Sequence, residues 1–265
     1  MTAPTIDAPA YFDQLAQAEA VHWWHAAMWR ITSGWLDRAL RGRSGLVALD
    51  VGCGAGGTLR RLADRREIGR VIGIDPSRRA LAIASDRCRA GLGQLTLTLG
   101  SALAVPFDSE SIDMATCFDV LQHLPPGGDL VAITELRRVL RPGGVAIIRA
   151  NGAGLWPDRS QVEQPYRLRT LINLARSAGL IVRRATYANC LPAVATEVLG
   201  RVRGNSRHGH PQGGGLRIRS RHPLANRIMG AVATAEAFAV THLSARLPVG
   251  HTTMMLVEAP GGSTP

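Results

Sequence analysis

The stretch VALDVGCGAGG, residues 47–57, is the strongest indication of the fold in this sequence. An apolar run ends here in a group of glycines, and a helix-like segment, TLRRLADRR, follows at once. The glycines fit the dinucleotide fingerprint G-x-G-x-x-G at Gly52, Gly54 and Gly57. They fit the shorter pattern G-x-G-x-G equally well, with Gly56 as the third glycine. A strand, a glycine turn and a helix in this order predict the first unit of a doubly wound fold, and they raise the question of which ligand the turn holds.

Strand-like and helix-like segments alternate along most of the remaining chain. Apolar or alternating runs predict strands at residues 46–51, 70–75, 95–100, 111–117, 145–150, 180–187 and 252–259. Helical spacing of apolar residues predicts helices at residues 58–66, 78–90, 129–140 and 168–179. Such alternation is typical of a parallel sheet with helices on both faces. The sequence therefore predicts an α/β fold with a doubly wound, mostly parallel sheet of seven strands.

Residues 1–265 read as one domain with two additions to the alternating core. Residues 10–40 are rich in aromatic and apolar positions at helical spacing, and they predict an N-terminal helical cap. Residues 46–188 form the predicted core. Residues 189–247 interrupt the alternation with a glycine-rich part and a helix-like part, so we interpret them as an insertion and lid before the last strand, at 248–258.

The composition excludes several classes of protein. With 46% hydrophobic residues the chain can bury a core, but no apolar run approaches the roughly 20 residues of a membrane span. The N-terminal sequence MTAPTIDAPAYFDQ lacks the basic start and apolar centre of a signal peptide. The four cysteines form no C-x-x-C pair, which argues against a disulfide framework and a zinc site. We therefore expect a chain in the reducing cytoplasm with no membrane span.

The net charge of +11 is concentrated in one segment. All 31 basic residues are arginines, and seven of them lie between Gly200 and Ala235, where no acidic residue occurs. This segment is a candidate for contacting anions, nucleic acid included, and a solvated loop is the alternative. Since no RNA-binding signature accompanies the arginines, nucleic acid is an alternative partner and a small molecule the leading one.

Two aspartates discriminate between the ligands of the glycine turn. Asp50 lies two residues before Gly52, at the strand end that faces the ligand. A carboxylate there repels a pyrophosphate and attracts an ammonium or sulfonium group. Asp75, at the end of the second strand, suits the hydroxyls of a ribose, and it also suits a cap of the helix that follows Pro76. A P-loop is excluded, because the chain contains no lysine.

At this point the chain resembles class I S-adenosylmethionine-dependent methyltransferases, specifically the UbiE/type-11 group. The matching segments LDVGCGAGG, VIGIDPS, GSALAVPFDSESIDMATCFDVLQHL and ELRRVLRPGG occur in the family's order over about residues 46–150. The N-terminal segment EAVHWWHAAMWRI also looks like the entry segment of many bacterial members. The resemblance implies S-adenosylmethionine as the cofactor and methyl transfer as the activity.

The resemblance also implies roles for the cofactor-binding residues. Asp50 and the backbone of Gly52–Gly54 meet the methionine part, Asp75 meets the ribose, and the backbone near Phe118 lies under the sulfonium. Ser101 replaces the aspartate that usually contacts the adenine, which leaves a weaker hydrogen-bond partner there. The full set is Asp50, Gly52, Cys53, Gly54, Asp75, Pro76, Ser101, Ala102 and Phe118.

The candidates for the methyl acceptor's side are aromatic residues and histidines. His123 follows the fourth strand and has an ordinary pKa near neutrality, so it is the candidate general base, with a histidine tied to a helix end as the alternative. His22 and His25, three residues apart, are expected on one helical face. The candidate substrate-binding residues are His22, Trp23, His25, Trp156 and Tyr166, for all of which packing is the alternative role.

We expect an enzyme that methylates a small molecule, with an oxygen of a metabolite or natural product as acceptor. The alternatives are an RNA or anionic-polymer methyltransferase and a cyclase that uses S-adenosylmethionine as an electrostatic aid, because fold alone does not fix function. No metal is expected, since Asp119 and Asp129 lack a third acidic partner after the fourth strand.

Overall fold

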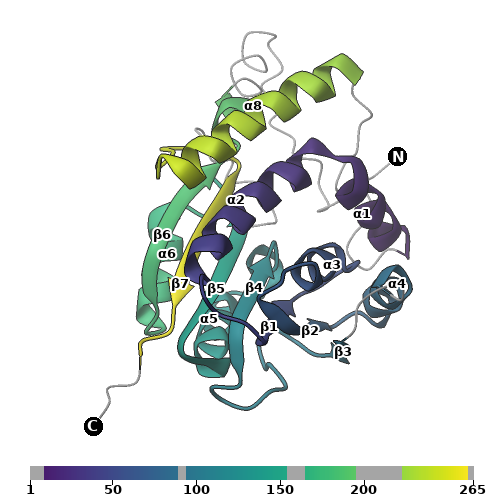
Figure 1. Ribbon diagram of the computed structural model, residues 1–265, viewed down its shortest axis with the longest axis vertical. Helices are drawn as coiled ribbons and strands as arrows, with labels where there is room; N and C mark the ends of the chain where they lie inside the picture. The colour runs from purple at the N-terminus through teal and green to yellow at the C-terminus, as the bar shows by residue number, and fades with distance from the viewer. Residues whose placement is uncertain (1–8, 89–93, 154–164, 195–222, 262–265) are drawn as a thin grey trace.

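The computed structural model describes residues 9–88, 94–153, 165–194 and 223–261. Their centre is a mostly parallel sheet of seven strands, as the sequence predicts, and the order of its strands is β3-β2-β1-β4-β5-β7-β6 (Figure 1). The strands are β1 Leu46–Val51, β2 Ile68–Asp75, β3 Leu95–Leu99, β4 Ile112–Phe118, β5 Leu140–Asn151, β6 Ile181–Ala188 and β7 Thr252–Glu258. Only β7 runs antiparallel to its neighbours, β5 and β6.

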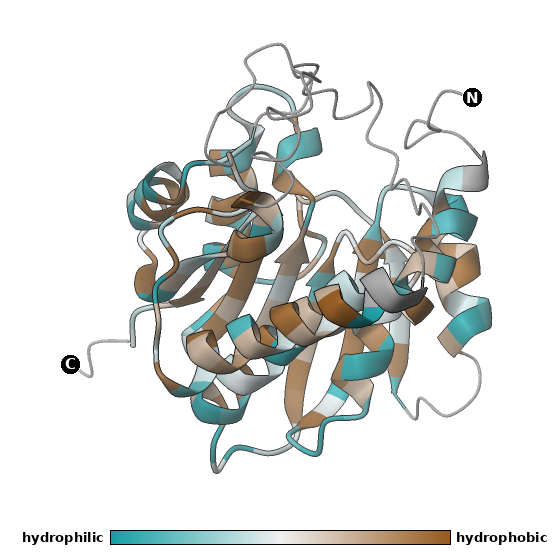
Figure 2. Cartoon of the chain, turned by 90° about the horizontal axis from the view of Figure 1, so that it is seen from above, coloured by the Kyte–Doolittle hydropathy of each residue, from teal (hydrophilic) through white to brown (hydrophobic). Residues whose placement is uncertain are grey.

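Helices cover both faces of this sheet. They are α1 Pro9–Val21, α2 Trp23–Ala39, α3 Gly57–Ala63, α4 Arg78–Cys88, the 3-10 helix η1 Leu121–His123, α5 Gly128–Val139, α6 Leu168–Ser177 and α8 Pro223–His242. One core lies between the sheet and α5 with α6, and the other lies between the sheet and α2, α3, α4 and α8. Val145 and Ile147 of β5 face the second core, whereas Ala146 and Ile148 face the first, as the pleat of a strand requires. The strands accordingly carry mostly hydrophobic residues, coloured brown in Figure 2.

The order of the strands places the candidate ligand site. β1 lies between β2 and β4, so the chain leaves β1 toward one edge of the sheet and later returns on its other side. In open α/β sheets a ligand lies beyond the carboxyl ends of the strands at this switch point. Asp50, Asp75 and Phe118 come from the carboxyl ends of β1, β2 and β4, and they therefore meet at this edge.

Two expected boundaries differ from the observed ones. Residues 10–40 form two helices, α1 and α2, which are separated at His22. β5 begins at Leu140 and not at Val145, because Leu140 pairs with Ile112 before the register shifts. The segment RPGG at 141–144, expected to separate the helix from the strand, is therefore part of the strand.

α8, within the predicted 189–247 insertion, packs against α2 and adds Ala233, Ala237 and Val240 to the second core (Figure 1). The lid role of 189–247 remains a proposal, and residues 195–222 of this segment lie outside the described residues. Within the part of the chain that the structure describes, no helix has the length and apolar character that spanning a membrane requires.

One carboxylate of α8 holds the end of β6. Glu236 is buried and accepts hydrogen bonds from the backbone N–H groups of Asn189 (2.5 Å), Cys190 (2.9 Å) and Leu191 (3.3 Å). We expect Glu236→Ala to lower the free energy of unfolding by about 2–3 kcal/mol, because three backbone donors lose a charged acceptor. Urea unfolding checks this, with Thr234→Ala on the exposed face of α8 as control. An equal effect of the two substitutions would contradict the anchoring role.

Candidate active site at the carboxyl edge of the sheet

The glycine turn folds onto the end of β2. Gly52 N and Cys53 N both donate to the carbonyl of Ile74, at 2.8 and 2.9 Å, and Gly54 N donates to Asp75 Oδ2 at 3.0 Å. These N–H groups are satisfied within the protein, so they are not available to bind the pyrophosphate of a dinucleotide. Gly52 has φ +71°, and a Cβ there would lie 2.3 Å from Cγ2 of Val120. The turn is thus tightly packed against the segment that follows β4.

Asp50 is a buried carboxyl group at the centre of the site. Its side chain is on the end of β1, the residue is 2% exposed, and Oδ1 accepts a hydrogen bond from Thr116 Oγ1 at 2.6 Å. Burial raises the pKa of Asp50 to about 7, the hydrogen bond from Thr116 opposes this, and Glu19 adds to it. A buried carboxylate is costly without a positive partner, so this group favours a cationic ligand.

Asp75 connects the glycine turn to the start of α4. Its Oδ2 accepts from Gly54 N, and its Oδ1 accepts from Ser77 N at 2.8 Å. Ser77 Oγ accepts from Ala80 N at 3.2 Å, so Ser77 caps the helix. Burial raises the pKa of Asp75, and the two backbone N–H groups oppose the rise. Each carboxylate oxygen has a further lone pair, which leaves Asp75 able to accept from ribose hydroxyls. Pro76 is exposed beside it.

The loop after β3 begins beside Asp75. Gly100 N donates to the carbonyl of Asp75 at 3.2 Å. Ser101 Oγ accepts from Leu103 N at 3.1 Å, and Ala102 is buried. The loop that the resemblance assigns to the adenine is therefore adjacent to the carboxyl group that it assigns to the ribose.

α1 covers the glycine turn and contributes a residue that sequence reasoning missed. Glu19 Oε2 pairs with Arg87 Nη1 at 2.6 Å, and the same nitrogen donates to the carbonyl of Ala55 at 2.6 Å. A Cβ on Gly57 would lie 2.4 Å from Cδ of Glu19. Burial raises the pKa of Glu19, while Arg87 opposes the rise. Glu19 and Asp50 thus both lie near the turn; Glu19 is neutralised by Arg87, whereas Asp50 is hydrogen-bonded to the neutral hydroxyl of Thr116. An acidic residue on a helix carries no signal from which this could be predicted.

Arg149 is the second residue that the sequence analysis missed. Its guanidinium lies between two aromatic rings, 4.7 Å from the centroid of Trp24 and 4.4 Å from that of Phe118. Its Nε and Nη2 contact Asp119 Oδ2 at 3.0 and 2.5 Å. Asp119 has φ +58°, an uncommon backbone conformation that directs the residue after Phe118 toward Arg149. In the sequence Arg149 stands out only as a single charged residue near the end of an apolar strand.

The histidines at the start of α2 lie beside this stack, but not as predicted. His22 lies just before α2 and caps it, with Nδ1 accepting from Trp24 N at 3.2 Å, so the expectation that both histidines lie within one helix was wrong. The ring centroids of His22 and His25 are nevertheless 6.5 Å apart, and the ring centroids of His25 and Trp24 are 4.7 Å apart. Burial and the positive charge of Arg149 lower the pKa of His25 to about 3. Its Nε2 is buried and has no hydrogen-bond partner among the described residues.

The other predicted acceptor residues are placed differently. Trp23 packs at the second core and faces Gly230 of α8. His123 is exposed on η1. Tyr166 is buried, and its hydroxyl oxygen lies 3.3 Å from the carbonyl oxygen of Leu121 and 3.2 Å from Asp129 Oδ2, two acceptors that share its one proton, so it supports η1. Trp156 lies outside the described residues. Among the residues that are described, no three histidine, cysteine or acidic side chains are grouped as a metal site.

Comparison with known proteins identifies the central part of the chain. The family described as “Methyltransferase domain” matches residues 48–144. An “Uncharacterized 37.1 kDa protein in transposon TN4556” of Streptomyces fradiae is 40% identical over 139 residues, which cover 52% of this chain and 37% of that protein. Demethylmenaquinone methyltransferase of Bacillus subtilis (strain 168) is 31% identical over 118 residues, 43% of this chain and 50% of that protein. The chain thus spans half or less of the length of these relatives.

Solved structures share the fold. The [4+2]-cyclase SpnF superposes with a TM-score of 0.56 at 22% identity, covering 86% of this chain and 79% of that one. A SAM-dependent methyltransferase from Aquifex aeolicus superposes with a TM-score of 0.52 at 20% identity, covering 68% of this chain and 92% of that one. Together with the ordered motifs and the seven-stranded sheet, these matches lead to one conclusion. The chain carries a class I S-adenosylmethionine-dependent methyltransferase domain, and S-adenosylmethionine is the cofactor of this family.

Proposed function

We propose that the chain is a methyltransferase that uses S-adenosylmethionine to methylate an oxygen atom of a small metabolite or natural product. The observation that carries the cofactor half is the buried carboxyl group of Asp50, hydrogen-bonded to the neutral Thr116, beside a glycine turn whose N–H groups are already satisfied. Such a site disfavours a pyrophosphate and favours a cation.

The residues at the edge of the sheet fit the cofactor. In the proposal Asp50 and the backbone of Gly52–Gly54 hold the methionine part, Asp75 holds the ribose, and Ser101 with Ala102 borders the adenine. When bound, the cofactor supplies a sulfonium methyl group that is strongly electrophilic. The protein's main task is then alignment, for which well-oriented reactants gain roughly 7–11 kcal/mol.

The stack of Trp24, Arg149 and Phe118 is the proposed wall of the acceptor site. Phe118 is at the end of β4, next to the predicted position of the methyl group, and the stack fixes it from one side. The aromatic rings exclude water, and Arg149 is neutralised by Asp119. This favours an acceptor with an apolar ring carrying a polar atom. Part of the chain is similar to demethylmenaquinone methyltransferases, and demethylmenaquinone, the acceptor that their name gives, is a small molecule, which supports an acceptor of this class here.

His25 and His123 are compared here as the general base that removes a proton from the acceptor. With a pKa of about 3, His25 is neutral at pH 7 and is too weak a base to take a proton from a hydroxyl. It can accept or donate a hydrogen bond through Nε2. His123, on η1 directly after β4, remains the proposed base. A cytoplasmic location and a role in natural-product synthesis stay predictions.

Two other functions are outcomes of the same test. A cyclase on this fold is suggested by the similarity in shape to SpnF, and an RNA methyltransferase by the arginines of residues 200–235, most of which lie outside the described residues. Turnover with a panel of phenols, quinols, amines and short RNAs is measured by release of S-adenosylhomocysteine. The proposal expects release with phenols or quinols. Release with RNA alone, or consumption of an acceptor without any release, would contradict it.

Arg149→Met tests the wall of the acceptor site. We expect the variant to lower kcat/KM by about 100-fold, because Phe118 and Trp24 lose their shared partner and the acceptor is misaligned. The Kd for S-adenosylmethionine should change by less than about threefold, since Arg149 contacts none of the residues assigned to the cofactor except Phe118. Steady-state kinetics with calorimetry measure both, and Arg30→Met on the exposed side of α2 is the control. Unchanged kcat/KM would remove the stack from the site.

A further inference from the structure

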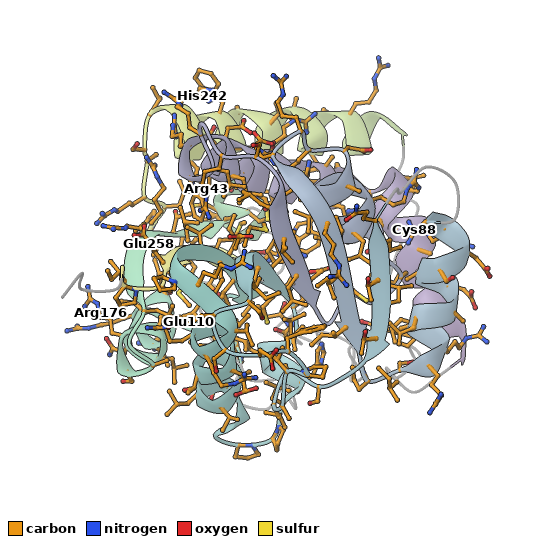
Figure 3. All side chains as sticks on the ribbon, turned by 60° about the horizontal axis from the view of Figure 1, so that its bottom comes forward. Arg43, Cys88, Glu110, Arg176, His242 and Glu258 are labelled. Carbon is orange, nitrogen blue, oxygen red and sulfur yellow. The ribbon has the colours of Figure 1, made fainter. Side chains whose placement is uncertain are left out.

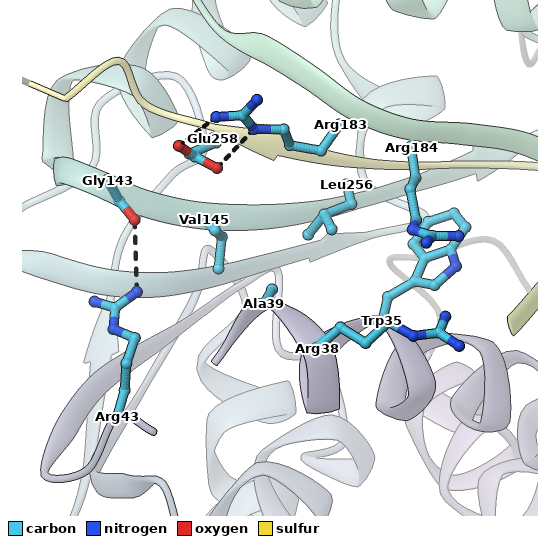
Figure 4. Close-up of a pocket in the computed structure, with 10 residues that line it drawn as sticks. All are labelled: Trp35, Arg38, Ala39, Arg43, Gly143, Val145, Arg183, Arg184, Leu256 and Glu258. Atoms are coloured by element: carbon cyan, nitrogen blue, oxygen red, sulfur yellow. Dashed lines mark hydrogen bonds and ion pairs between the residues drawn. The ribbon is translucent and has the colours of Figure 1, made fainter. Parts of the chain in front are cut away.

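A concave site lies at the edge of the sheet opposite the candidate active site. It is a groove of about 430 Å³ between α2 and strands β5, β6 and β7, and we call it the arginine groove (Figure 4). The charged and aromatic side chains that line it are Trp35, Arg38, Arg43, Arg183, Arg184 and Glu258. Arg43 and Glu258 lie on the far side of the molecule from Cys88 of α4 (Figure 3).

The arginine groove is separate from the candidate active site. Gly143 and Val145, at the start of β5, line the groove, whereas Arg149 at the end of the same strand belongs to the aromatic stack. From Gly143 to Arg149 the strand advances roughly 20 Å. A ligand in the groove therefore does not occupy the site of methyl transfer.

The charges in the groove are unbalanced. Four of its lining residues are arginines and one, Glu258, is acidic. Glu258 is fully engaged by Arg183, with Nε to Oε2 at 2.7 Å and Nη2 to Oε1 at 2.8 Å. Arg38 donates to the carbonyl of Thr241, and Arg184 donates to Ser244 Oγ at 3.1 Å, so these two cations have neutral partners.

The remaining arginine is only weakly neutralised. Arg43 Nη2 is 3.5 Å from Asp113 Oδ1, and Asp113 Oδ2 is already paired with Arg141 at 2.7 Å. Arg43 also donates a long hydrogen bond, 3.5 Å, to the carbonyl of Gly143 (Figure 4). The groove thus has an excess of positive charge whose mutual repulsion an anion would relieve.

An unpaired indole adds an independent observation. Trp35 lines the groove and is 2% exposed, and its buried Nε1–H has no hydrogen-bond partner among the residues that the structure describes. A buried N–H donor without an acceptor is unfavourable, so its position favours an acceptor supplied by a ligand. In Figure 4 Trp35 is drawn at the same end of the groove as Arg38 and Arg184.

We propose that the arginine groove binds the phosphoryl group of a small molecule. Guanidinium groups match phosphate oxygens with paired N–H donors, and the three groups at one end, Arg38, Arg184 and Trp35, offer only donors. The volume of the groove lies in the range of small-molecule sites, which leaves room for more than an isolated phosphate. Phosphoryl oxygens accept from Arg38 and Arg184, and Arg43 contributes long-range attraction from the other end.

Calorimetric titration at constant ionic strength tests the proposal, with pyrophosphate, AMP and ADP as probes. We expect saturable binding of one pyrophosphate per chain, weakened at least tenfold in the double variant Arg38→Gln, Arg184→Gln. The control double variant Arg30→Gln, Arg70→Gln removes the same charge from exposed positions and should change Kd less than twofold. Tighter binding of ADP or AMP would identify a nucleotide as the source of the phosphoryl group, and equal binding would identify the phosphoryl group alone.

Arg184→Lys keeps the test decisive if the double variant does not fold, because it keeps the positive charge and removes the paired N–H donors of the guanidinium, and it should weaken pyrophosphate about tenfold. Asp50→Asn should leave pyrophosphate binding unchanged, which separates this site from the proposed function. Absence of saturable binding would overturn the proposal. Equal weakening by the two double variants, or affinity for RNA that grows only with its length, would show nonspecific attraction to the net charge and would also overturn it.

Discussion

We expect Asp50→Asn to weaken the binding of S-adenosylmethionine about 10- to 150-fold at pH 8. The substitution keeps the size of the side chain and removes the charge that faces the cation. A hydrogen bond to a charged group contributes about 1.5–3 kcal/mol, which corresponds to this range of Kd. Asp50 is 2% exposed, so water does not replace the lost partner. Calorimetry on the wild type and the variant measures the effect.

The same carboxyl group makes the affinity depend on pH. Because the pKa of Asp50 is raised to about 7, the group is increasingly protonated below pH 7 and no longer attracts a cation. The Kd of the wild type should be constant above pH 8 and should rise by up to about tenfold per pH unit below pH 7. In Asp50→Asn most of this slope should be lost.

The free energy of unfolding of the ligand-free chain changes with pH in the opposite direction to the affinity: it decreases as the pH rises. Between the ordinary pKa of an aspartate, 3.8, and about 7, the folded chain holds a proton on Asp50 that the unfolded chain has released. The proton held by folded Asp50 stabilises the folded chain most strongly below pH 4. As the pH rises from 4 to 7, the free energy of unfolding therefore falls by up to about 1.4 kcal/mol per pH unit. The difference between wild type and Asp50→Asn in urea unfolding should show this slope.

Thr116→Val is the matched control for these measurements. The hydrogen bond from Thr116 Oγ1 lowers the pKa of Asp50, so its removal should move the midpoint of the pH dependence upward. The carboxylate remains, and affinity at high pH should be largely retained. If Asp50→Asn binds S-adenosylmethionine as tightly as the wild type at pH 8, Asp50 does not contact the cofactor.

Gly52→Ala should have the second large effect. The added Cβ would lie 2.3 Å from Cγ2 of Val120, and the residue would be held at φ +71°. We expect a loss of about 3 kcal/mol in the free energy of unfolding and a Kd for S-adenosylmethionine at least 30-fold higher, because overpacking displaces both the turn and the segment after β4. Urea unfolding and calorimetry measure the two quantities.

Two further variants separate the clash from the backbone strain. Gly42 has φ +75° with no atom within 4 Å of an added Cβ, so Gly42→Ala should cost only about 1 kcal/mol and leave binding unchanged. Val120→Ala combined with Gly52→Ala should restore part of the lost affinity. Equal losses in Gly52→Ala and Gly42→Ala would mean that contact with Val120 is not the cause.

Patterns of neighbouring residues were sufficient to predict the sheet. Each strand has a local period, and the glycine turn with Asp50 and Asp75 is contained in two short segments. The start of β5 was missed because RPGG is typical of a turn, and pairing of Leu140 with Ile112 outweighed that tendency. At this position strand pairing, and not the local turn preference of the sequence, determined the structure.

The acceptor side could not be predicted in the same way. Arg149 meets Trp24 and Phe118 from three separate elements, and no spacing in the sequence encodes that contact. Glu19 likewise becomes part of the site only because α1 lies over the turn. His22 and His25 were predicted on one helix, but the hydrogen bond of His22 Nδ1 to Trp24 N starts a new helix there. The roles proposed for His123, His25 and Trp156 stay predictions.

Calorimetric titration of the wild-type chain with S-adenosylmethionine and, separately, with NADH distinguishes the two ligands that the glycine turn could hold. The buried carboxyl groups at the glycine turn predict one S-adenosylmethionine bound per chain, with micromolar affinity that Asp50→Ala and Asp75→Ala both reduce, and no binding of NADH. Binding of NADH in place of S-adenosylmethionine, or of neither ligand, would contradict the account.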